Sequence, residues 1–325
     1  MLRKDVFRIV VATLVFLAAW ALVFTRAFGI AGPRWGANYF PNVPLTTQNG
    51  KTVHFYDDLL KDKIVAIDLI YTHCVDSCPL ETARLAQVQK LLGDRVGKDI
   101  FFYSISIDPK RDTPAVLKEY AEKYHAGPGW LFLTGKPSDI DLISKKLGLY
   151  SDPDSGNRDG HTTQLLVGNV ATGQWVQDSA VDNPRYLATT LSNFIDGFRK
   201  PSPEGQKTYA AAAPIHADSG QYLFATRCAA CHTLGHGVRI GPDLLGITKV
   251  RDHAWLARMI QRPDEMLAQK DPLALLLFRK YNRVQMPNLR LGPQDTEKVI
   301  NFLQNYPAAP DGRSGSEAGA NTARN

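Results

Sequence analysis

Residues 63–79 read KIVAIDLIYTHCVDSCP, and this stretch decides the architecture of the first half of the chain. Its first part, 63–71, is almost continuously apolar and rich in β-branched side chains, which is typical of a strand buried on both faces of a sheet. Cys74 and Cys78 follow where this strand gives way to a helix. Backbone N–H groups at a helix N-terminus favour the thiolate form, so the sequence predicts two unusually acidic thiols here.

Apolar strands and amphipathic helices alternate on the C-terminal side of this stretch. Thr113 and Pro114 have the residue types of a helix N-cap and first turn, and Thr172-Gly173 is typical of a hairpin turn. An α/β sheet with an antiparallel edge is therefore predicted. Its strands are expected at 63–71, 100–107, 130–133, 164–170 and 174–177, and its helices at 79–95, 113–125, 137–147 and 183–198.

The chain has 325 residues, which is enough for two domains that each bury a core of their own. Its four cysteines form two close pairs, whereas a small disulfide-stabilised protein would spread them through a short chain. Two close pairs on a long chain indicate two chemical sites. The net charge is +6 but the basic residues are scattered, which argues against nucleic acid and allows at most a preference for acidic protein surfaces.

The second cysteine pair belongs to the segment Cys228-Ala-Ala-Cys231-His232, which is the attachment motif of a c-type haem. Two thiols three residues apart on one helical turn can form thioethers with both vinyl groups of one porphyrin, and the adjacent imidazole then faces the iron. A zinc site would need two more thiolate or imidazole ligands, and this part of the chain offers only His236 and His253. The motif therefore predicts covalently bound haem c with His232 as an axial ligand.

A second axial ligand has to come from another part of the chain, and Met286 has the best position for it. It lies in the irregular segment 285–289 (QMPNL), as expected of a ligand that approaches the iron from the other face. Met259 and Met266 occur in a segment with helical apolar periodicity, where methionine is usually a core residue. Histidine and methionine ligation predicts a closed, six-coordinate iron of relatively high potential that transfers electrons and binds no substrate.

The segment Gly241-Pro242-Asp243-Leu244 resembles the proline-containing loop that supports the proximal histidine in class I cytochromes c. Residues 221–306 as a whole are similar to that family, with helical periodicity and irregular Gly/Pro segments between the helices. The resemblance implies an all-α cytochrome c domain in the C-terminal part of the chain.

The first cysteine pair allows three chemical interpretations from its residues alone. A redox dithiol usually has two residues between its cysteines, whereas three separate Cys74 from Cys78 and make a loop wide enough for both sulfurs to face one ion. Thiolate pairs select Cu(I), and an added imidazole suits Cu(II). The third interpretation is a plain structural disulfide in an oxidising compartment. Copper, a redox dithiol and a disulfide all stay open on this basis.

Three segments of the chain together resemble the Sco/SenC family: 71–79 (YTHCVDSCP), 106–114 (SIDPKRDTP) and 130–135 (WLFLTG). The resemblance extends over about residues 41–198. It implies a thioredoxin-like fold and a role in assembly of the dinuclear copper centre of cytochrome c oxidase, with the copper-bearing oxidase subunit as partner. It also implies three copper ligands, which are Cys74, Cys78 and a histidine in a later loop that matches His161.

The surroundings of His161 depart from the family pattern. The family commonly has Asp-His-Ser or Asp-His-Thr, whereas residues 159–162 read Asp-Gly-His-Thr, so the support of the imidazole by neighbouring groups is expected to differ. His73 is the second choice as a ligand, because it adjoins Cys74 but lies at the end of a strand and is expected to point away. Three polar residues are expected to brace the loop and cap a helix rather than do chemistry: Asp108, Arg111 and Asp112.

The N-terminus predicts that the protein is exported and stays attached to the membrane. Three basic residues, Arg3, Lys4 and Arg8, precede the uncharged apolar run 9–24. A membrane-spanning helix needs about 20 apolar residues and a signal-peptide core about 7–15, so this run lies between the two. Because no clear cleavage site follows, we favour an uncleaved single-pass anchor over a cleaved signal. The basic end stays in the cytoplasm, which places both domains on the periplasmic or extracytoplasmic side of the cytoplasmic (inner) membrane.

The predicted fold class is an α/β thioredoxin-like domain followed by an all-α cytochrome c domain, with an N-terminal transmembrane helix. A linker rich in proline and alanine is expected between the two domains, and a polar tail without aromatic residues is expected to be disordered. The predicted regions are 1–32 (membrane anchor), 33–198 (thioredoxin-like Sco/SenC domain), 199–218 (linker), 219–306 (cytochrome c domain) and 307–325 (disordered tail).

We expect a copper-binding metallochaperone fused to a haem c electron carrier, rather than a turnover enzyme. The main alternative is a haem-linked thiol–disulfide oxidoreductase that acts on oxidase cysteines, and another is a first domain that only docks the cytochrome to a partner. One haem transfers one electron, which matches the Cu(II)/Cu(I) couple, whereas a dithiol–disulfide couple needs two. This stoichiometry favours copper as the redox partner of the haem without excluding the dithiol.

Overall fold

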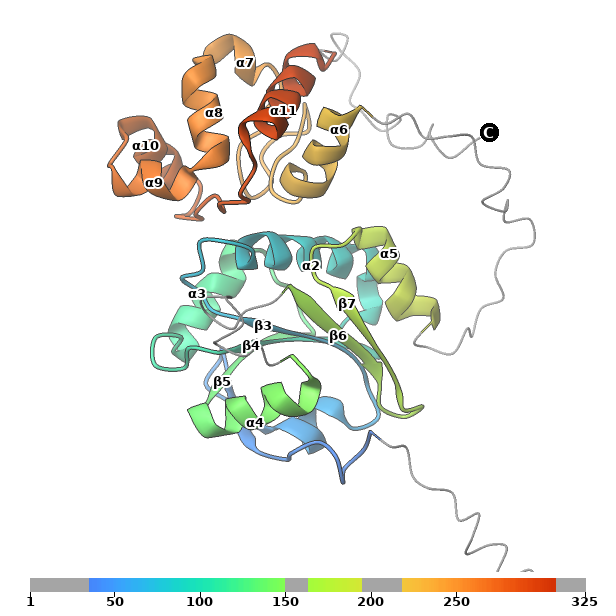
Figure 1. Ribbon diagram of the computed structural model, residues 1–325. Helices are drawn as coiled ribbons and strands as arrows, with labels where there is room; N and C mark the ends of the chain where they lie inside the picture. The colour runs from blue at the N-terminus through green and yellow to red at the C-terminus, as the bar shows by residue number, and fades with distance from the viewer. Residues whose placement is uncertain (1–34, 150–162, 195–217, 308–325) are drawn as a thin grey trace, which may run out of the picture.

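The computed structural model describes residues 35–149, 163–194 and 218–307, which form a sheet domain and a helical domain (Figure 1). The predicted anchor, the loop with His161, and almost all of the predicted linker and tail lie outside these residues. Among the described residues, no helix combines the length and the apolar character needed to cross a membrane.

The sheet domain is built on a seven-stranded mixed sheet with the order β2-β1-β5-β4-β3-β6-β7. Strand β3 (Ile64–Ile70) is buried along its whole length and pairs in parallel with β4 (Ile100–Ser106). β4 pairs in parallel with β5 (Trp130–Gly135). On the other side of β3, β6 (Gln164–Asn169) runs antiparallel and forms a hairpin with β7 (Gln174–Ser179). The predicted α/β sheet with an antiparallel edge is therefore confirmed.

No strand is predicted from the sequence at the opposite edge of the sheet, but the structure has two there. β1 (Pro44–Thr47) and β2 (Thr52–His54) form a hairpin, and β1 pairs antiparallel with β5. Both strands are too short for the apolar alternation by which strands are recognised. A π-helical turn, η1 (Phe55–Leu60), follows the hairpin and packs into the core on one face of the sheet.

Helices cover both faces of the sheet (Figure 1). One face carries α2 (Cys78–Leu92), α3 (Pro114–Lys123) and α5 (Pro184–Thr189), whose buried side chains share one apolar core with the strands. The other face carries α4 (Pro137–Leu147), which packs together with η1. α5 continues into a π-helical turn, η4 (Thr190–Phe194). Each of the four helices predicted for this domain is thus present in the described residues.

α2 begins directly at the second cysteine, one residue earlier than predicted. Ser77 occupies the N-cap position, Cys78 is the first helical residue, and Pro79 lies in the first turn, where its missing N–H breaks no helical hydrogen bond. The helix ends at Leu92, and Gly93 follows with a φ of 56°, in the left-handed region that favours glycine. Because β3 leads into this helix through a short loop, both thiols lie at the carboxyl end of a central strand.

The C-terminal domain is helical with irregular segments between its helices, as predicted. Its first helix, α6 (Ser219–Leu223), continues into a π-helical turn, η6 (Phe224–Cys228), and packs against the last helix, α11 (Pro293–Asn305). A Cβ on Gly220 would collide with the backbone oxygen of Lys298, so glycine permits this close crossing. The helices between them are α7 (Ile247–Val250), α8 (His253–Gln261), α9 (Pro263–Ala268) and α10 (Pro272–Lys280).

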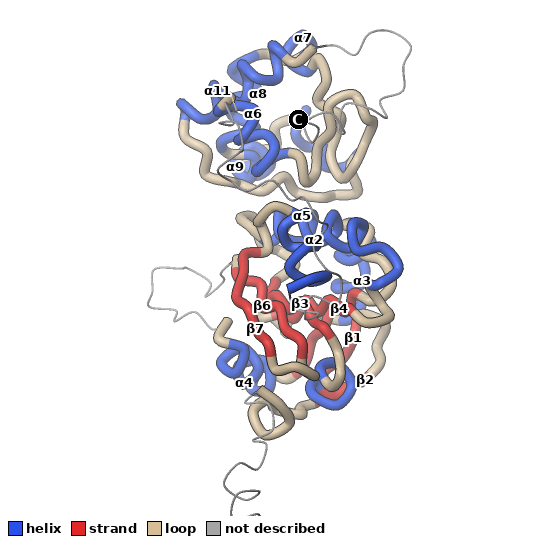
Figure 2. Tube along the Cα trace, turned by 90° about the vertical axis from the view of Figure 1, so that its right-hand side faces the viewer, coloured by secondary structure: helices blue, strands red, loops and turns tan. Residues whose placement is uncertain are grey.

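The helical domain lies against the α2 side of the sheet domain (Figure 2). A backbone hydrogen bond of 2.8 Å from the Asn288 N–H to the Val75 carbonyl oxygen joins the helical domain to the loop between the two cysteines. The fold therefore brings the two cysteine motifs to the same boundary, although they are far apart in the sequence.

Candidate metal and haem sites

Cys74 and Cys78 lie at the junction of β3 and α2, inside a small apolar cluster with Tyr71. Cys74 is 5% exposed and Cys78 is fully buried. A hydrogen bond of 3.2 Å from the Cys74 N–H to the Tyr71 carbonyl oxygen closes the turn before the helix. Both cysteines are free thiols, so the structure does not have the plain disulfide that was one of the three interpretations.

The two thiols differ in their tendency to ionise. A hydrogen bond from Cys78 lowers the pKa of Cys74 to about 5, although burial opposes this shift. Burial raises the pKa of Cys78 well above its usual range, and its hydrogen bond to Cys74 adds to the rise. Near neutral pH the pair therefore contains one thiolate, on Cys74, and one thiol proton. Two sulfurs that share a hydrogen bond are also close enough to bind one soft metal ion.

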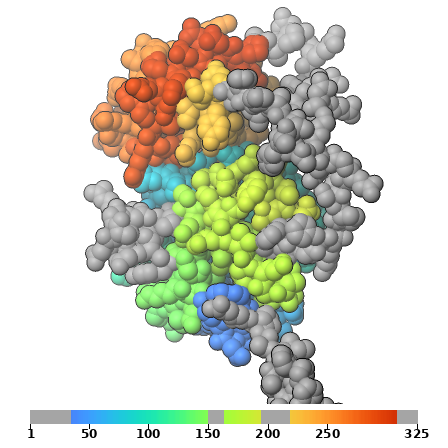
Figure 3. Space-filling model, turned by 45° about the vertical axis from the view of Figure 1, so that its right-hand side comes forward, coloured from blue at the N-terminus to red at the C-terminus, as the bar shows by residue number. Residues whose placement is uncertain are grey.

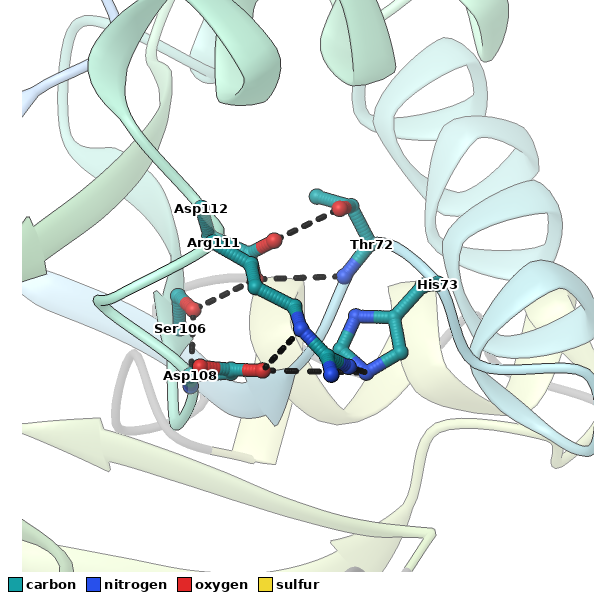
Figure 4. Close-up of polar contacts among 6 residues, drawn as sticks. All are labelled: Thr72, His73, Ser106, Asp108, Arg111 and Asp112. Carbon is teal, nitrogen blue, oxygen red and sulfur yellow. Dashed lines mark hydrogen bonds and ion pairs between the residues drawn. The ribbon is translucent and has the colours of Figure 1, made fainter.

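Asp112 holds the loop before the first cysteine in place. Its carboxyl group is fully buried and accepts hydrogen bonds from the Thr72 N–H at 3.1 Å and from the Thr72 hydroxyl at 2.6 Å. The Ser106 hydroxyl, at the end of β4, donates to the same carboxyl group at 2.6 Å (Figure 4). The carboxyl group thus ties the ends of two parallel strands together, and the expected bracing role of Asp112 is confirmed.

His73 is turned toward the neighbouring loop on the protein surface. Its Nε2 atom lies 2.9 Å from Nη1 of Arg111, which can only donate, and 3.7 Å from Oδ2 of Asp108 (Figure 4). The imidazole also packs edge-on against Tyr71, with 4.9 Å between the ring centroids. His73, the second choice as copper ligand, therefore belongs to a polar surface cluster with Asp108 and Arg111, which hold its imidazole in place.

The third predicted copper ligand, His161, lies outside the described residues. Within the part of the chain that the structure describes, no group of three His, Cys, Asp or Glu side chains is arranged to hold a metal ion. The structure thus brings Cys74 and Cys78 together, and the completion of this pair by His161 stays a prediction.

Two buried carboxyl groups of the first domain, those of Glu81 and Asp68, are not predicted from the sequence. Burial raises the pKa of Glu81, which lies within electrostatic range of both thiols, well above its usual range. Burial also raises the pKa of Asp68 to about 7, although the Ser104 hydroxyl donates to it at 2.7 Å. Burial thus disfavours the charged form of both carboxyl groups, and a carboxyl group that is less ionised opposes a neighbouring thiolate less strongly. The lone acidic residue inside the apolar run 63–71 is a signal that could have found Asp68.

The haem motif is positioned by the turn that ends η6. The His232 N–H donates to the Cys228 carbonyl oxygen at 3.0 Å, so the imidazole lies one turn beyond the first thiol. Nδ1 of His232 lies 2.9 Å from the carbonyl oxygen of Pro242, which can only accept. This contact places the proton on Nδ1 and leaves Nε2 to face a metal. A Cβ on Gly241 would lie 2.6 Å from the ring, so glycine lets the loop approach the histidine as the sequence predicts.

Asp243 stabilises the loop that supports His232. Its Oδ1 atom accepts hydrogen bonds from the N–H groups of Gly235 at 2.8 Å and Leu245 at 2.9 Å, and its Oδ2 atom accepts one from Gly237 at 2.7 Å. The loop is therefore held by three backbone hydrogen bonds to one carboxyl group. Burial lowers the pKa of His232, which keeps the imidazole neutral and able to bind iron.

A cavity of about 320 Å³ in the helical domain is lined by His232 and Met286, and a smaller cavity of about 50 Å³ adjoins Cys228 and Cys231. Trp255, Leu256 and Leu277 contribute to the apolar wall of the larger one. Cys231, His232 and Met286 line both cavities and Cys228 lines the smaller one, so the four predicted haem residues surround two neighbouring cavities. An apolar space with two thiols, one imidazole and one thioether in its wall fits the donor set of a c-type haem.

The three candidate methionines of this domain occupy different positions. Met286 lines both cavities, including the one beside the cysteines. Met259, on α8, lines only the larger cavity, and Met266 is buried in the core. The position of Met286 agrees with its predicted role as axial ligand, which stays a prediction.

These two sites define the class of the protein: a thioredoxin-like domain with a buried thiol pair, fused to a cytochrome c domain. The sequence model of the SCO1/SenC family matches residues 36–177, and that of cytochrome c matches residues 217–307. Protein SenC of Rhodobacter capsulatus is 30% identical over 161 residues, which make up 48% of this chain and 71% of that protein. The chain therefore belongs to the SCO1/SenC family and carries a cytochrome c domain on its C-terminal side.

Other relatives match one domain or the other. The SCO2-like protein of Rickettsia felis is 35% identical over 115 residues, and the match spans 35% of this chain and only 54% of that protein. The structure of Bradyrhizobium japonicum ScoI with copper bound has 30% identity and a TM-score of 0.38, and covers 46% of this chain and 94% of that chain. The cytochrome c domain of the pp3183 protein from Pseudomonas putida has 49% identity and a TM-score of 0.25, and covers 26% of this chain and 84% of that chain.

Proposed function

We propose that this chain is a copper-binding metallochaperone that serves assembly of the dinuclear copper centre of cytochrome c oxidase and carries its own haem c for one-electron transfer. Membership of the SCO1/SenC family supports the copper part, and the fused cytochrome c domain supports the haem part. The observation that carries the proposal is the buried pair Cys74 and Cys78, which shares a hydrogen bond and contains one thiolate near neutral pH.

Copper would be held by Cys74, Cys78 and His161. Two thiolates suit Cu(I), and an added imidazole suits Cu(II), so one site can hold both oxidation states. Cys78 has to lose its proton when the ion binds, so binding releases a proton and becomes tighter as the pH rises. Asp112 already fixes the loop through Thr72, and the metal therefore does not have to order this part of the site.

The haem would be attached through Cys228 and Cys231, with His232 and Met286 as axial ligands. When bound there it supplies reversible transfer of one electron. Pro242 holds His232 so that Nε2 faces the cavity, and the apolar wall keeps water away. A wall of low polarity favours the less charged ferrous state, so these residues raise the reduction potential.

The proposed partner for copper transfer is the copper-bearing subunit of the oxidase. The proposed location is the cytoplasmic (inner) membrane, with one membrane pass and both domains on the extracytoplasmic side. The basic residues before the apolar run 9–24 support this orientation. The net charge of +6 is compatible with an acidic surface on the partner.

A thiol–disulfide oxidoreductase that acts on oxidase cysteines is the second candidate. The lowered pKa of Cys74 favours it, because the thiolate is the nucleophile in disulfide exchange. The couple formed by a dithiol and a disulfide takes two electrons, however, and fits a single haem less well than the one-electron couple of copper. Copper is therefore the preferred cargo.

Metal and haem analysis of the full-length protein in detergent tests this proposal. We expect one tightly bound copper ion and one haem per chain after loading with Cu(I). Cys74→Ala should lose the copper and keep the haem. Val75→Ala, which changes an exposed side chain in the same loop, is the matched control and should keep both. A protein that carries haem, binds no copper and reduces disulfides would instead support the second candidate.

A further inference from the structure

Two polar side chains of α2 reach across the boundary to the cytochrome c domain. Arg84 Nη2 donates to the Thr226 carbonyl oxygen at 3.0 Å, and Gln87 Nε2 donates to the Ala229 carbonyl oxygen at 3.2 Å. Arg84 is only 4% exposed, so this part of the boundary excludes solvent. Figure 3 shows the orange and red surface of the cytochrome c domain directly against the cyan surface of the first domain. Both carbonyl groups belong to the segment that contains Cys228.

A second set of contacts joins the loop between the two thiols to the segment after Met286. The Asn288 N–H donates to the Val75 carbonyl oxygen at 2.8 Å. The Arg290 guanidinium lies 3.1 Å from the carboxyl group of Asp76. The first domain therefore contacts the cytochrome c domain at two places, one next to Cys228 in the sequence and the other next to Met286.

Between these two sets of contacts, the first domain reaches the haem cavities themselves. Pro79 lines the cavity of about 320 Å³, together with His232 and Met286. Leu80 lines the cavity of about 50 Å³ beside the haem cysteines and is 2% exposed. Pro79 and Leu80 are the two residues that directly follow Cys78 in α2. The cytochrome c domain alone therefore leaves these cavities with an incomplete wall.

We propose that Pro79 and Leu80 of the thioredoxin-like domain are part of the haem-binding site, so that the haem pocket is built from both domains. The cysteines attach to one edge of the porphyrin, and the small cavity that Leu80 lines lies beside them. With haem attached, Leu80 would present an apolar side chain, in place of water, to the part of the pocket beside the two cysteines. The proposal requires only that Cys228 and Cys231 carry haem c, and it holds whether the first domain binds copper or exchanges disulfides.

If the first domain forms part of the pocket, it should influence the reduction potential of the haem. Ferric haem carries one more positive charge than ferrous haem, so removal of water from its edge disfavours the ferric state and raises the potential. Replacement of Leu80 by a polar residue should lower the potential again. Because Pro79 is bonded to Cys78, the wall of the haem pocket also lies one residue from the candidate copper site.

An optical redox titration of the haem in the full-length protein tests the composite pocket. Leu80→Asn should lower the equilibrium constant for haem reduction about tenfold, which is about 59 mV for a one-electron couple. Leu80→Met, which keeps an apolar side chain of similar volume, should leave the potential near that of the unmutated protein. Leu85→Asn is the matched control, because Leu85 is similarly buried on the same helix but lines neither cavity. Where circular dichroism shows that the first domain of this control stays folded, its haem potential should be unchanged.

A second set of variants avoids the apolar core altogether. Arg290→Glu places two carboxyl groups against each other at an exposed part of the boundary, and it should loosen the docking and lower the potential. Asp76→Arg combined with Arg290→Glu restores the attraction and should recover the potential. Arg262→Glu is the control for the change of charge, because Arg262 is an exposed arginine of the same domain that pairs with Glu265 instead.

If the haem pocket is built from both domains, the reduction potential should fall even if Leu80→Asn unfolds the first domain. In that case the apolar cover is lost completely, and the potential should fall by at least as much. An unchanged potential in Leu80→Asn would overturn the proposal, whether or not circular dichroism shows a folded first domain. An equal fall in Arg262→Glu and Arg290→Glu would also contradict it, because the effect would then reflect charge alone.

Discussion

The two cysteine pairs of this chain have opposite electrostatic settings. In the first pair, a hydrogen bond from Cys78 lowers the pKa of Cys74 to about 5. In the second pair, burial raises the pKa values of Cys228 and Cys231 to about 12. One pair is thus half ionised near neutral pH, whereas burial favours the neutral form of the other two thiols, which line an apolar cavity.

The number of residues between the two cysteines and the surroundings of the thiols together determine what each pair can do. Three intervening residues at a helix start let Cys74 and Cys78 share one proton, which suits a metal ion that has to be bound and released. Two intervening residues within one turn direct both other thiols toward one cavity, which suits a permanent attachment. One chain can therefore contain a cysteine pair that binds a metal ion reversibly and a second pair that attaches a haem permanently.

Loss of the covalent haem is the largest effect that we expect. Cys228→Ala combined with Cys231→Ala should abolish the reduced c-type spectrum that survives extraction with acidified acetone, because no thioether can form. The matched control is Cys74→Ala combined with Cys78→Ala, which should keep the full spectrum. Haem that is extracted freely from the unmutated protein would show that the second pair is not an attachment site.

Variants of the first cysteine pair should lose copper binding and keep the haem. Cys74→Ala and Cys78→Ala should each weaken Cu(I) binding by more than the roughly 10–100-fold that loss of an outer-sphere partner costs, because each removes a direct ligand. His161→Ala should spare Cu(I) more than Cu(II), since two thiolates already suit the softer ion. Competition titrations with a chelator measure both ions. Equal loss of Cu(I) and Cu(II) in His161→Ala would indicate a structural histidine, and retention of both would shift attention to His73.

The axial methionine provides a smaller effect within the haem site. Met286→Ala should open a coordination position and lower the equilibrium constant for haem reduction on the order of a hundredfold, because thioether ligation favours the ferrous state. Redox titration and the spectrum of the ferric protein measure the change. Met259→Ala is the control from the same cavity and should keep the six-coordinate spectrum. If Met259→Ala instead loses the six-coordinate spectrum, Met259 and not Met286 is the axial ligand.

The pH dependence of thiol alkylation measures the ionisation of Cys74. Iodoacetamide reacts with the thiolate, and Cys74 is a thiolate above a pKa of about 5, so its rate in the metal-free protein should stay high at neutral pH and fall only near pH 5. Cys78→Ala removes the hydrogen bond that stabilises this thiolate, so the midpoint should move to higher pH. A midpoint near the ordinary thiol value of about 8.5 in the unmutated protein would contradict the shared proton.

The parts of the fold that could be predicted from the sequence are those with a recognisable pattern among neighbouring residues. The strand β3 is predicted because the run 63–71 is almost continuously apolar, and the haem motif is predicted because its three functional residues lie within five consecutive positions. The hairpin of β1 and β2 has no such signal, because β1 depends on pairing with β5, as in the register of Leu45 with Gly135. Sequence patterns report on neighbours along the chain, and this strand is held by residues that are far away in it.

The parts of the site that could not be predicted depend on contacts between distant segments. Leu80 looks like an ordinary core residue of an amphipathic helix, and only the docking of the second domain places it beside the haem cavity. Glu81 follows the second thiol in the first turn of α2, and only its complete burial distinguishes it from a surface carboxylate. Asp68 is the exception, because an acidic residue in a buried strand is visible in the sequence.

Stopped-flow mixing of Cu(II) with the full-length ferrous protein measures whether the haem passes its electron to the copper that the same chain binds. We expect about one haem oxidised per copper bound, at a rate independent of protein concentration, because Cys78 lies one residue from the wall of the haem pocket. Cys74→Ser combined with Cys78→Ser should abolish this fast phase, and without copper the haem should stay ferrous over the same period. A rate proportional to protein concentration, or an unchanged fast phase in the double variant, would show that the haem serves an outside partner instead of the copper bound in its own chain.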